Sequence, residues 1–253
     1  MKTRHERTRS LVRKAYGKVA KSSLSCCSSV SCCTPAAVSA EGELGLSCGN
    51  PVAFSKIKKG MTVLDLGSGA GKDVFIAAPL TGPEGRVIGV DMTPEMLKLA
   101  AGNLLKFTAR TGLRNVEFRK GVIEKLPVRD GEADLIISNC VINLSPDKPA
   151  VFREAFRALK PGGHIVVSDI VLNRELPPSL KKHAGLYAAC VAGALQRGAY
   201  LGAIEDAGFK GIKLLSDLTY RAADLELDPF TAKAGKALDG AASSITVFAV
   251  KKK

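Results

Sequence analysis

The sequence has no tryptophan, no long apolar run and few histidines, and each absence narrows what the chain can do. No stretch approaches the roughly 20 consecutive apolar residues that cross a bilayer. No apolar core of about 7–15 residues follows the basic N-terminus, as a secretory signal would require. We therefore expect a cytoplasmic protein whose thiols stay reduced. His164 and His183 stand alone, and we expect them to be structural or exposed rather than catalytic.

The positive charge is concentrated at the two ends of the chain. The formal net charge is +13, of which residues 1–21 carry +7 and residues 251–253 carry +3. The remaining charge is mild for a nucleic-acid-binding domain, and the missing tryptophan makes base-stacking platforms scarce. We expect residues 1–21 to form an amphipathic helix with a solvated basic face. Its apolar side would consist of Leu11, Val12, Ala15 and Val19.

From residue 60 onward, short apolar segments alternate with segments of helical spacing. The expected strands cover 63–66, 86–91, 116–118, 133–139 and 164–168. Thr93-Pro94-Glu95 has the N-cap, first-turn proline and first-turn acid of a helix start. Such alternation predicts right-handed βαβ units and a parallel sheet.

The last third of the chain follows another pattern. Residues 177–208 have helical spacing, and residues 212–218 and 244–250 resemble strands. Two such strands would close the sheet with an antiparallel pair at one edge, as is common on mostly parallel sheets. The sequence therefore predicts an α/β fold with a doubly wound, mostly parallel, seven-stranded sheet.

A glycine-rich turn follows the first strand, in Asp65-Leu-Gly67-Ser-Gly69-Ala-Gly71. Its spacing is not that of a dinucleotide-binding turn, and it lacks the glycine and the Ser or Thr of a phosphate-cradling loop. Glycines let the backbone approach a ligand closely, and an acid before the turn suits a cationic head group. Asp91 ends the second strand, where an acid can accept hydrogen bonds from ribose hydroxyls. Taken singly, the turn could be a plain strand-to-helix connection and Asp91 a surface acid.

Together these features resemble the class I S-adenosylmethionine methyltransferases over roughly residues 55–172. The resemblance implies that the turn holds the amino-acid part of S-adenosylmethionine and that Asp91, followed by Met92, binds the ribose. It also implies that Ile123 and Glu124 lie at the adenine and that Asn139 helps to form the cofactor site. Leu159-Lys-Pro-Gly-Gly163, before the fifth strand, matches the family as well.

The seven cysteines suggest a second site. In a cytoplasmic protein we expect thiols, metal ligands or catalysts rather than a disulfide framework. Cys140 follows Asn139 at the end of the fourth strand, beside the glycine turn, where a side chain can face the transferred methyl group. Cys48 lies in a turn-rich loop and Cys190 in the helical stretch. Cys140 and Cys190 could each be a small buried apolar residue, since cysteine packs that way.

The cysteine-bearing stretches resemble the arsenite methyltransferases over most of residues 16–210. The matching segments are Tyr16-Gly17 followed by paired cysteines, Leu46-Ser-Cys48-Gly-Asn-Pro51, Ser138-Asn-Cys140-Val-Ile-Asn-Leu144 and Tyr187-Ala-Ala-Cys190-Val-Ala-Gly193. The resemblance implies that Cys48, Cys140 and Cys190 are the catalytic thiolates that bind trivalent arsenic. It also implies that N-terminal cysteines relay arsenic or exchange disulfides. Of the four candidates, Cys26, Cys27, Cys32 and Cys33, the last two are better placed.

The implied chemistry suits these residue types. Trivalent arsenic is a soft centre that prefers thiolates, and its lone pair can attack a sulfonium methyl group without a general base. The enzyme would mainly position the reactants. An external thiol such as glutathione or thioredoxin would restore trivalent arsenic through disulfide exchange. We expect arsenite as substrate, no nucleic-acid or membrane partner, and a monomer. The number of methyl groups added, and antimony or selenium as substrates, stay open.

We expect three parts along the chain. Residues 1–43 would form the basic helix and a cysteine-rich segment, and residues 44–172 the S-adenosylmethionine-binding α/β domain. Residues 173–253 would form a substrate-binding cap with the closing strands.

Two other functions stay open. A small-molecule C- or O-methyltransferase with incidental cysteines would need an acid or base near the methyl group, for which His183 or Tyr187 are candidates. A non-enzymatic thiol protein could bind zinc or a metalloid through residues 26–33, but their spacing does not match a zinc finger. It would also leave the glycine turn at 65–71 without a purpose.

Overall fold

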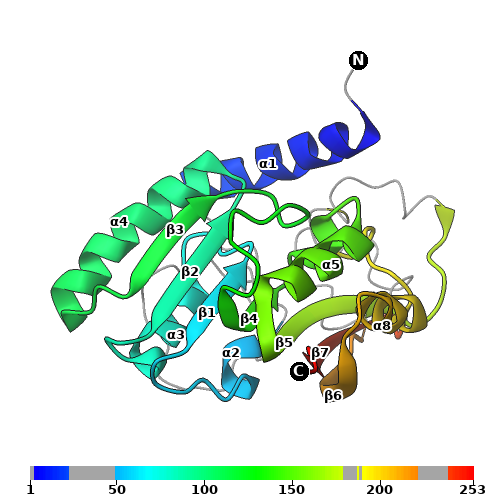
Figure 1. Cartoon of the computed structure of the whole chain (residues 1–253). Coiled ribbons are helices and arrows are strands. Elements are labelled where there is room, and N and C mark those ends of the chain that lie inside the picture. Colours follow the sequence, from blue (N-terminus) through cyan, green and yellow to red (C-terminus); the bar gives the residue numbers. More distant parts are fainter. Residues whose placement is uncertain (1–2, 23–48, 179–186, 188–189, 222–238) are drawn as a thin grey trace.

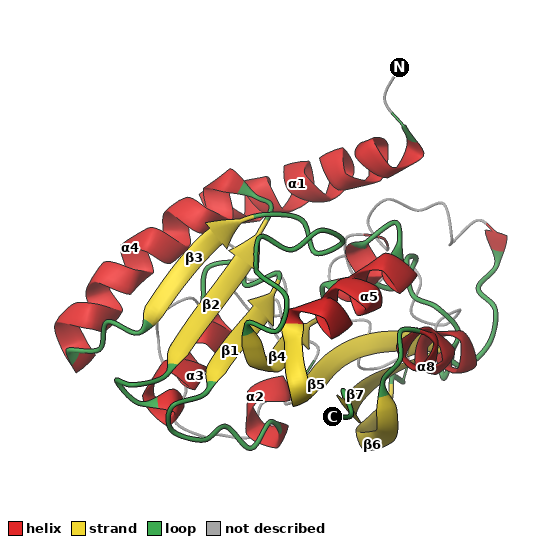
Figure 2. Ribbon diagram, in the orientation of Figure 1, coloured by secondary structure: helices red, strands yellow, loops and turns green. Residues whose placement is uncertain are grey.

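A computed structural model of the chain describes residues 3–22, 49–178, 187, 190–221 and 239–253 (Figure 1). Its centre is a seven-stranded sheet with the strand order β3-β2-β1-β4-β5-β7-β6. Helices cover both faces of this sheet (Figure 2). The expected doubly wound α/β architecture is confirmed.

Five strands of the sheet pair with one another in parallel, and the other two form its antiparallel part. The parallel strands are β1 (Thr62–Leu66), β2 (Arg86–Asp91), β3 (Val116–Lys120), β4 (Ala133–Asn139) and β5 (Leu159–Leu172). β7 (Ala242–Val250) lies between β5 and β6 (Lys210–Thr219) and is antiparallel to both. The expected antiparallel pair is therefore present, with β6 as the edge of the sheet.

Alternating side chains of the central strands supply both halves of the core. Leu64, Ile88, Ile136 and Ile165 occupy matching positions on one face, and Val63, Val87 and Leu135 point to the other, because successive strand residues alternate in direction. The first face packs against α5 (Lys148–Ala158) and α8 (Arg197–Asp206). The second packs against α2 (Pro51–Phe54), α3 (Lys72–Thr81) and α4 (Pro94–Thr111).

Helix α1 (Arg4–Ser22) corrects two expectations about the N-terminal segment. Its C-terminal end meets the start of α4, as Figure 1 shows, and the helix buries Val12 and Ala20. Leu11, expected on the apolar side, is 39% exposed, because the buried face is set by Val12, Tyr16 and Ala20 at four-residue spacing. The basic face is not wholly solvated either, since Arg9 pairs with the buried side chain of Glu124.

Several boundaries also differ from the sequence pattern. β5 already begins at Leu159 rather than at residue 164, so that Pro161 and Gly162 lie inside the strand. Asp147 caps α5, and the short 3-10 helix η1 (Ile142–Leu144) fills the turn before it. Of the expected helical stretch 177–208, residues 191–196 form no helix and α8 begins at Arg197, while residues 179–186 and 188–189 lie outside the described part. Among the helices that the structure describes, none is both long and apolar enough to span a membrane.

Candidate functional site

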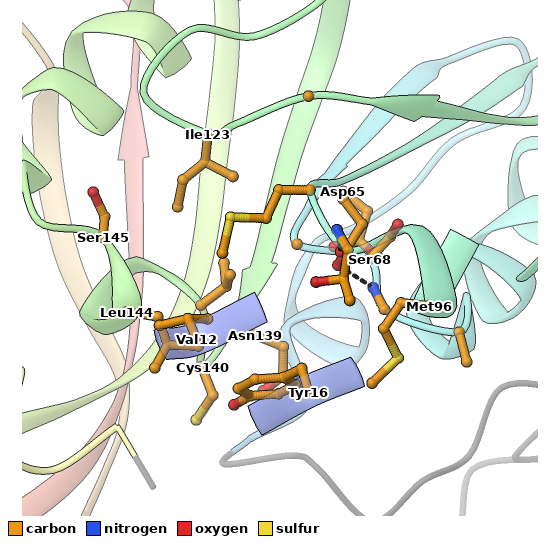
Figure 3. A pocket seen from close by; sticks show the side chains of 18 of the residues that line it. Val12, Tyr16, Asp65, Ser68, Met96, Ile123, Asn139, Cys140, Leu144 and Ser145 are labelled. Carbon is orange, nitrogen blue, oxygen red and sulfur yellow. Dashed lines mark hydrogen bonds between the residues drawn. The ribbon is translucent and has the colours of Figure 1, made fainter. Parts of the chain in front are cut away.

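A deep pocket opens beyond the carboxyl ends of β1 and β4, the two strands between which the sheet order reverses. Ligands of open α/β sheets bind at such a switch point. The pocket holds about 1040 Å³, part of it open to solvent. Figure 3 shows its walls, with Asp65 and Ser68 on one side and Val12, Tyr16 and Cys140 on another. All the cofactor-site residues expected from the sequence except Gly71 line this pocket, namely Asp65, Gly67, Gly69, Asp91, Met92, Ile123, Glu124 and Asn139.

The glycine-rich turn lies against the floor of this pocket. Gly67, Gly69 and Gly71 all have positive φ angles, of 70°, 53° and 98°. Residues other than glycine rarely adopt this backbone conformation. At Gly67 space is also limiting, since an added Cβ would lie 2.2 Å from Cγ2 of Val141. Gly71 caps the start of α3 but does not itself line the pocket.

Asp91 joins the turn to the start of α4. Its Oδ2 accepts a hydrogen bond from the Gly69 backbone N–H at 3.0 Å, and its Oδ1 accepts one from that of Thr93 at 2.7 Å. Burial raises the pKa of Asp91, while these hydrogen bonds act in the opposite direction. Each carboxylate oxygen has more than one lone pair, so both can still accept a hydrogen bond from a ligand hydroxyl.

The pocket is electrostatically suited to a cation. Besides Asp91 it contains Asp65, which is 3% exposed, and Asp73, which is 7% exposed. The pKa of Asp65 is raised well above its usual value, first by burial and then by the negative charges of Asp73 and Asp91. A positively charged ligand would relieve this repulsion and favour the ionised carboxylates.

Glu124 lies at the opposite end of the pocket. Its Oε1 accepts a hydrogen bond from Ser145 Oγ at 2.7 Å, and its Oε2 lies 3.4 Å from Nη2 of Arg9. Ile123 beside it is buried and apolar, as a planar ring would require. The helix α1 thereby reaches across the pocket and contacts its far end.

Two buried polar atoms of the lining lack a hydrogen-bond partner among the described residues, Ser68 Oγ and Arg9 Nε. Buried polar groups are otherwise almost always paired, so each marks a place where a ligand atom would be accommodated. Carboxylates at one end, an orphaned hydroxyl in the turn and an apolar wall at Ile123 together fit the charge and polarity of S-adenosylmethionine.

Asn139, at the end of β4, connects the segment before α2 to the first turn of α3. Its Nδ2 donates to the Gly49 carbonyl at 2.9 Å and to Asp73 Oδ2 at 3.0 Å. Gly49 is packed so tightly that an added Cβ would lie 2.7 Å from Cβ of Ser168. Gly49 directly follows Cys48 in the sequence and is anchored one residue from Cys140.

Cys140 and Cys190 come from separate segments of the chain and lie in contact. The thiol of Cys190 donates a hydrogen bond to the Cys140 carbonyl at 2.8 Å. Both residues are buried in one cluster, and Cys140 lines the pocket. Both also have positive φ angles, of 56° and 63°, which is uncommon for residues other than glycine. Such conformations persist where the surrounding structure enforces them and cluster at functional sites.

The two cysteines differ in their bonding. Cys140 is disulfide-bonded in this structure, whereas Cys190 keeps its thiol. The thiol of Cys140 would be released by disulfide exchange before it binds a metalloid. The expectation of thiols, ligands or catalysts rather than a disulfide framework stays a prediction.

The remaining expected cysteines, Cys26, Cys27, Cys32, Cys33 and Cys48, lie outside the described residues, as does His183. Within the described ranges, no group of three or more His, Cys, Asp or Glu side chains is arranged to hold a metal ion. The three-thiolate set thus stays a prediction.

Sequence reasoning missed several residues of the pocket. Arg9 and Val12 come from α1, and Ser68, Asp73 and Ser145 from loops and helix starts next to the expected residues. Ser68 and Asp73 could have been suggested by their position inside or directly after the glycine turn. For Arg9 there was no local signal, because its partner Glu124 is more than a hundred residues away in the sequence.

Comparison with known proteins agrees with this geometry. Residues 57–208 match a family model described as a methyltransferase domain. The chain is 41% identical over 234 residues to an arsenite methyltransferase of Halobacterium salinarum, covering 83% of this chain and 59% of that protein. It is 46% identical over 161 residues to one of Aquipseudomonas alcaligenes, covering 62% of this chain and 46% of that protein.

A solved structure is similar over nearly the whole chain. An arsenic(III) S-adenosylmethionine methyltransferase from Chlamydomonas reinhardtii superposes with a TM-score of 0.69 at 34% identity, covering 93% of this chain and 73% of that one. The chain is thus shorter than its relatives and spans about half to three fifths of the two curated proteins.

Proposed function

Because this chain belongs to the methyltransferase family, and within it to the arsenite methyltransferases, we propose that it transfers a methyl group from S-adenosylmethionine to trivalent arsenic held by cysteine thiolates. The observation that carries this proposal is the pair Cys140 and Cys190. The two residues lie in contact at the carboxyl end of β4, beside a pocket lined by Asp65, Asp73 and Asp91.

The cofactor would be held by residues of the pocket. Asp65 and the glycine turn would bind the ammonium and carboxylate of its methionine part, with Ser68 Oγ as a donor. Asp91 would accept hydrogen bonds from the ribose, and Ile123 and Glu124 would contact the adenine. S-adenosylmethionine, when bound, supplies a methyl carbon made electrophilic by its sulfonium sulfur.

The thiols would prepare the acceptor. Cys140 and Cys190, joined by Cys48, would replace the three hydroxyls of arsenous acid with sulfur, releasing three waters in all. Three thiolates would leave one lone pair on arsenic. When the cofactor is bound, this lone pair would form the new As–C bond as the bond between the methyl carbon and the sulfonium sulfur breaks. Arsenic would be formally oxidised by two electrons, and the sulfonium would become a neutral thioether. The residues around the site would act by alignment alone, since the attacking lone pair carries no proton to remove.

Turnover then requires two electrons from thiols. Two thiols that form a disulfide return pentavalent arsenic to the trivalent state, and an external thiol such as glutathione or thioredoxin reopens the disulfide. The disulfide at Cys140 is consistent with a cysteine that takes part in such exchange. Cys32 and Cys33 would serve as accessory thiols. A monomer, and the division at residues 43 and 172, stay predictions.

The test is a direct assay with a matched control. The reduced full chain is incubated with arsenite, S-adenosylmethionine and excess thiol, and arsenic species are separated by chromatography with mass detection. We expect methylated arsenic that disappears in Cys140→Ser and Cys190→Ser. Val191→Ala alters the same buried turn but keeps every thiol, and should retain the activity. If the cofactor binds and no methylated arsenic forms, the acceptor proposal fails and a carbon or oxygen acceptor replaces it.

A further inference from the structure

A buried polar network lies next to the turn that carries Cys140, and the proposed reaction does not use it. It consists of Asn143 in η1, Asp169 in β5 and Tyr200 in α8, each at most 1% exposed. Asn143 Nδ2 donates to Asp169 Oδ1 at 2.8 Å and to the Ile170 carbonyl at 2.6 Å. Tyr200 OH donates to Asp169 Oδ2 at 3.3 Å. Asn143 Oδ1 has no hydrogen-bond partner among the described residues, so the bonds donated by the Asn143 amide and the Tyr200 hydroxyl hold this arrangement together.

The turn that follows β4 is held between this network and the cysteine-bearing segment. The side chain of Asn143 donates hydrogen bonds to Asp169 and Ile170 and so connects the turn to β5. The cysteine-bearing segment also bonds to the turn, since Cys190 Sγ donates to the Cys140 carbonyl at 2.8 Å and Tyr187 OH donates to the Leu144 carbonyl at 3.2 Å. The turn between Cys140 and Leu144 is thus bonded on both sides.

The backbone of Asn143 also lies against Gly193. A Cβ added at Gly193 would lie 2.3 Å from the Asn143 carbonyl oxygen, so only glycine allows the two chains to approach this closely. Gly193 comes three residues after Cys190. A shift of Asn143 would therefore move the segment that carries Cys190 as well as the turn that carries Cys140.

The strained backbone at both cysteines needs such a restraint. Cys140 and Cys190 are two of the three residues other than glycine with positive φ among those described. An unrestrained cysteine would relax to a more ordinary conformation and point its sulfur elsewhere.

We propose that Asn143 is a positioning residue of the thiol site, fixed by Asp169 and Tyr200, and that it aligns the Cys140 turn with the Cys190 turn for binding a trivalent metalloid. This inference rests on the proposed function. It goes beyond it in assigning a role to three residues that touch neither the arsenic nor the cofactor.

The chain offers a matched control for the test. Asn115 is also buried and also donates its side-chain amide to backbone carbonyls, those of Ala78 and Gly82, but it does not line the pocket. Asn143→Ala and Asn115→Ala thus remove comparable hydrogen bonds from two places. A loss of general stability would affect both variants, whereas a loss of alignment would affect only the first.

Arsenite binding is measured by equilibrium dialysis of the full chain with a phosphine reductant and no cofactor, and cofactor binding by calorimetry. We expect Asn143→Ala to raise the arsenite dissociation constant about tenfold and to change that of S-adenosylmethionine by less than about twofold. Asn115→Ala should change neither. The proposal is overturned if Asn143→Ala binds arsenite like the wild type, or if Asn115→Ala weakens it equally. A wild-type chain that binds no arsenite would refute the proposed function itself.

Substitutions of Asp169 separate positioning from charge. Asp169→Asn keeps an oxygen for Asn143 and an amide that can donate to the Tyr200 oxygen, so arsenite binding should stay within about threefold of the wild type. Asp169→Ala should weaken it as much as Asn143→Ala, and equal losses in both Asp169 variants would overturn the positioning role. If Asn143→Ala does not fold, Tyr200→Phe, which removes one hydroxyl from the network, must weaken arsenite binding by about threefold. Unchanged binding in Tyr200→Phe would then overturn the proposal.

Discussion

Asp169 is a buried acid whose protonation should make the stability of this protein depend on pH. Burial raises its pKa to about 7, and Lys148, Tyr200 and Asn143 facing it lower the pKa only in part. The folded chain therefore binds a proton that the unfolded chain has already released between about pH 4 and pH 7. The contribution of Asp169 to stability is thus largest in acid and is lost as the pH rises through this range.

Asp169→Asn should remove this pH dependence. Between pH 4.5 and pH 7.5 the wild type should lose on the order of 3 kcal/mol of unfolding free energy relative to the variant. Urea unfolding of both proteins at the two pH values measures the difference, and other titrating groups cancel in the comparison. Parallel pH profiles would show that Asp169 does not hold the proton.

Asp91 permits a second prediction about a single carboxylate. Asp91→Ala should weaken S-adenosylmethionine binding about a hundredfold, because two charge-assisted hydrogen bonds from the ribose would be lost. Asp134 provides the control, since its Oδ2 likewise accepts a backbone N–H, from Thr62 at 2.8 Å, but it lies outside the pocket. Calorimetric titration of both alanine variants decides the matter, and equal affinities would remove Asp91 from the site.

Some residues of the site could be predicted from the sequence around them. The turn glycines, Asp65 and Asp91 follow from strand ends and glycine spacing, and all but Gly71 line the pocket. The Asn143–Asp169–Tyr200 network could not be foreseen, because each member is unremarkable in its own segment. Only the pairing of β4 with β5 and the packing of α8 bring the three together.

Helix α1 shows that apolar spacing alone does not predict which face of a helix is buried. Its hydrophobic spacing predicted a helix with the right extent, but the buried face depends on what the helix covers. Here it covers a pocket, so one arginine turns inward to Glu124 while Arg13 stays exposed. Apolar spacing carries no information about such a pair.

The ion pair at α1 should support cofactor binding. Arg9 and Glu124 are 27% and 8% exposed in their side chains, so solvent screens the pair only in part. Arg9→Met should weaken S-adenosylmethionine binding about fivefold, and added salt should weaken binding to the wild type more than binding to this variant. Arg13→Met removes the same charge from the exposed face and should leave the affinity unchanged. An equal effect of both substitutions would mean that only the net charge of the helix matters.

The whole molecule behaves as one unit because its chain ends are built into its centre. β7, the last strand, lies between β5 and β6 instead of at the edge, and α1, the first helix, covers the pocket formed by β1 and β4. The chain covers 59% of the Halobacterium salinarum relative, and its described residues form the seven-stranded sheet and line the pocket.

Cofactor binding should therefore stabilise all of it at once. A ligand that binds only the folded state at a hundred times its dissociation constant adds about 2.7 kcal/mol to the unfolding free energy. For a chain of this size that corresponds to a rise in Tm of roughly 5–10 °C. Scanning calorimetry should show one transition that shifts as a whole with S-adenosylmethionine, and at the same ligand concentration it should shift by only about 1–2 °C in Asp91→Ala. Two transitions, of which only one responds, would mean instead that the C-terminal strands fold apart from the pocket and that the Cys190 segment is coupled to it only weakly.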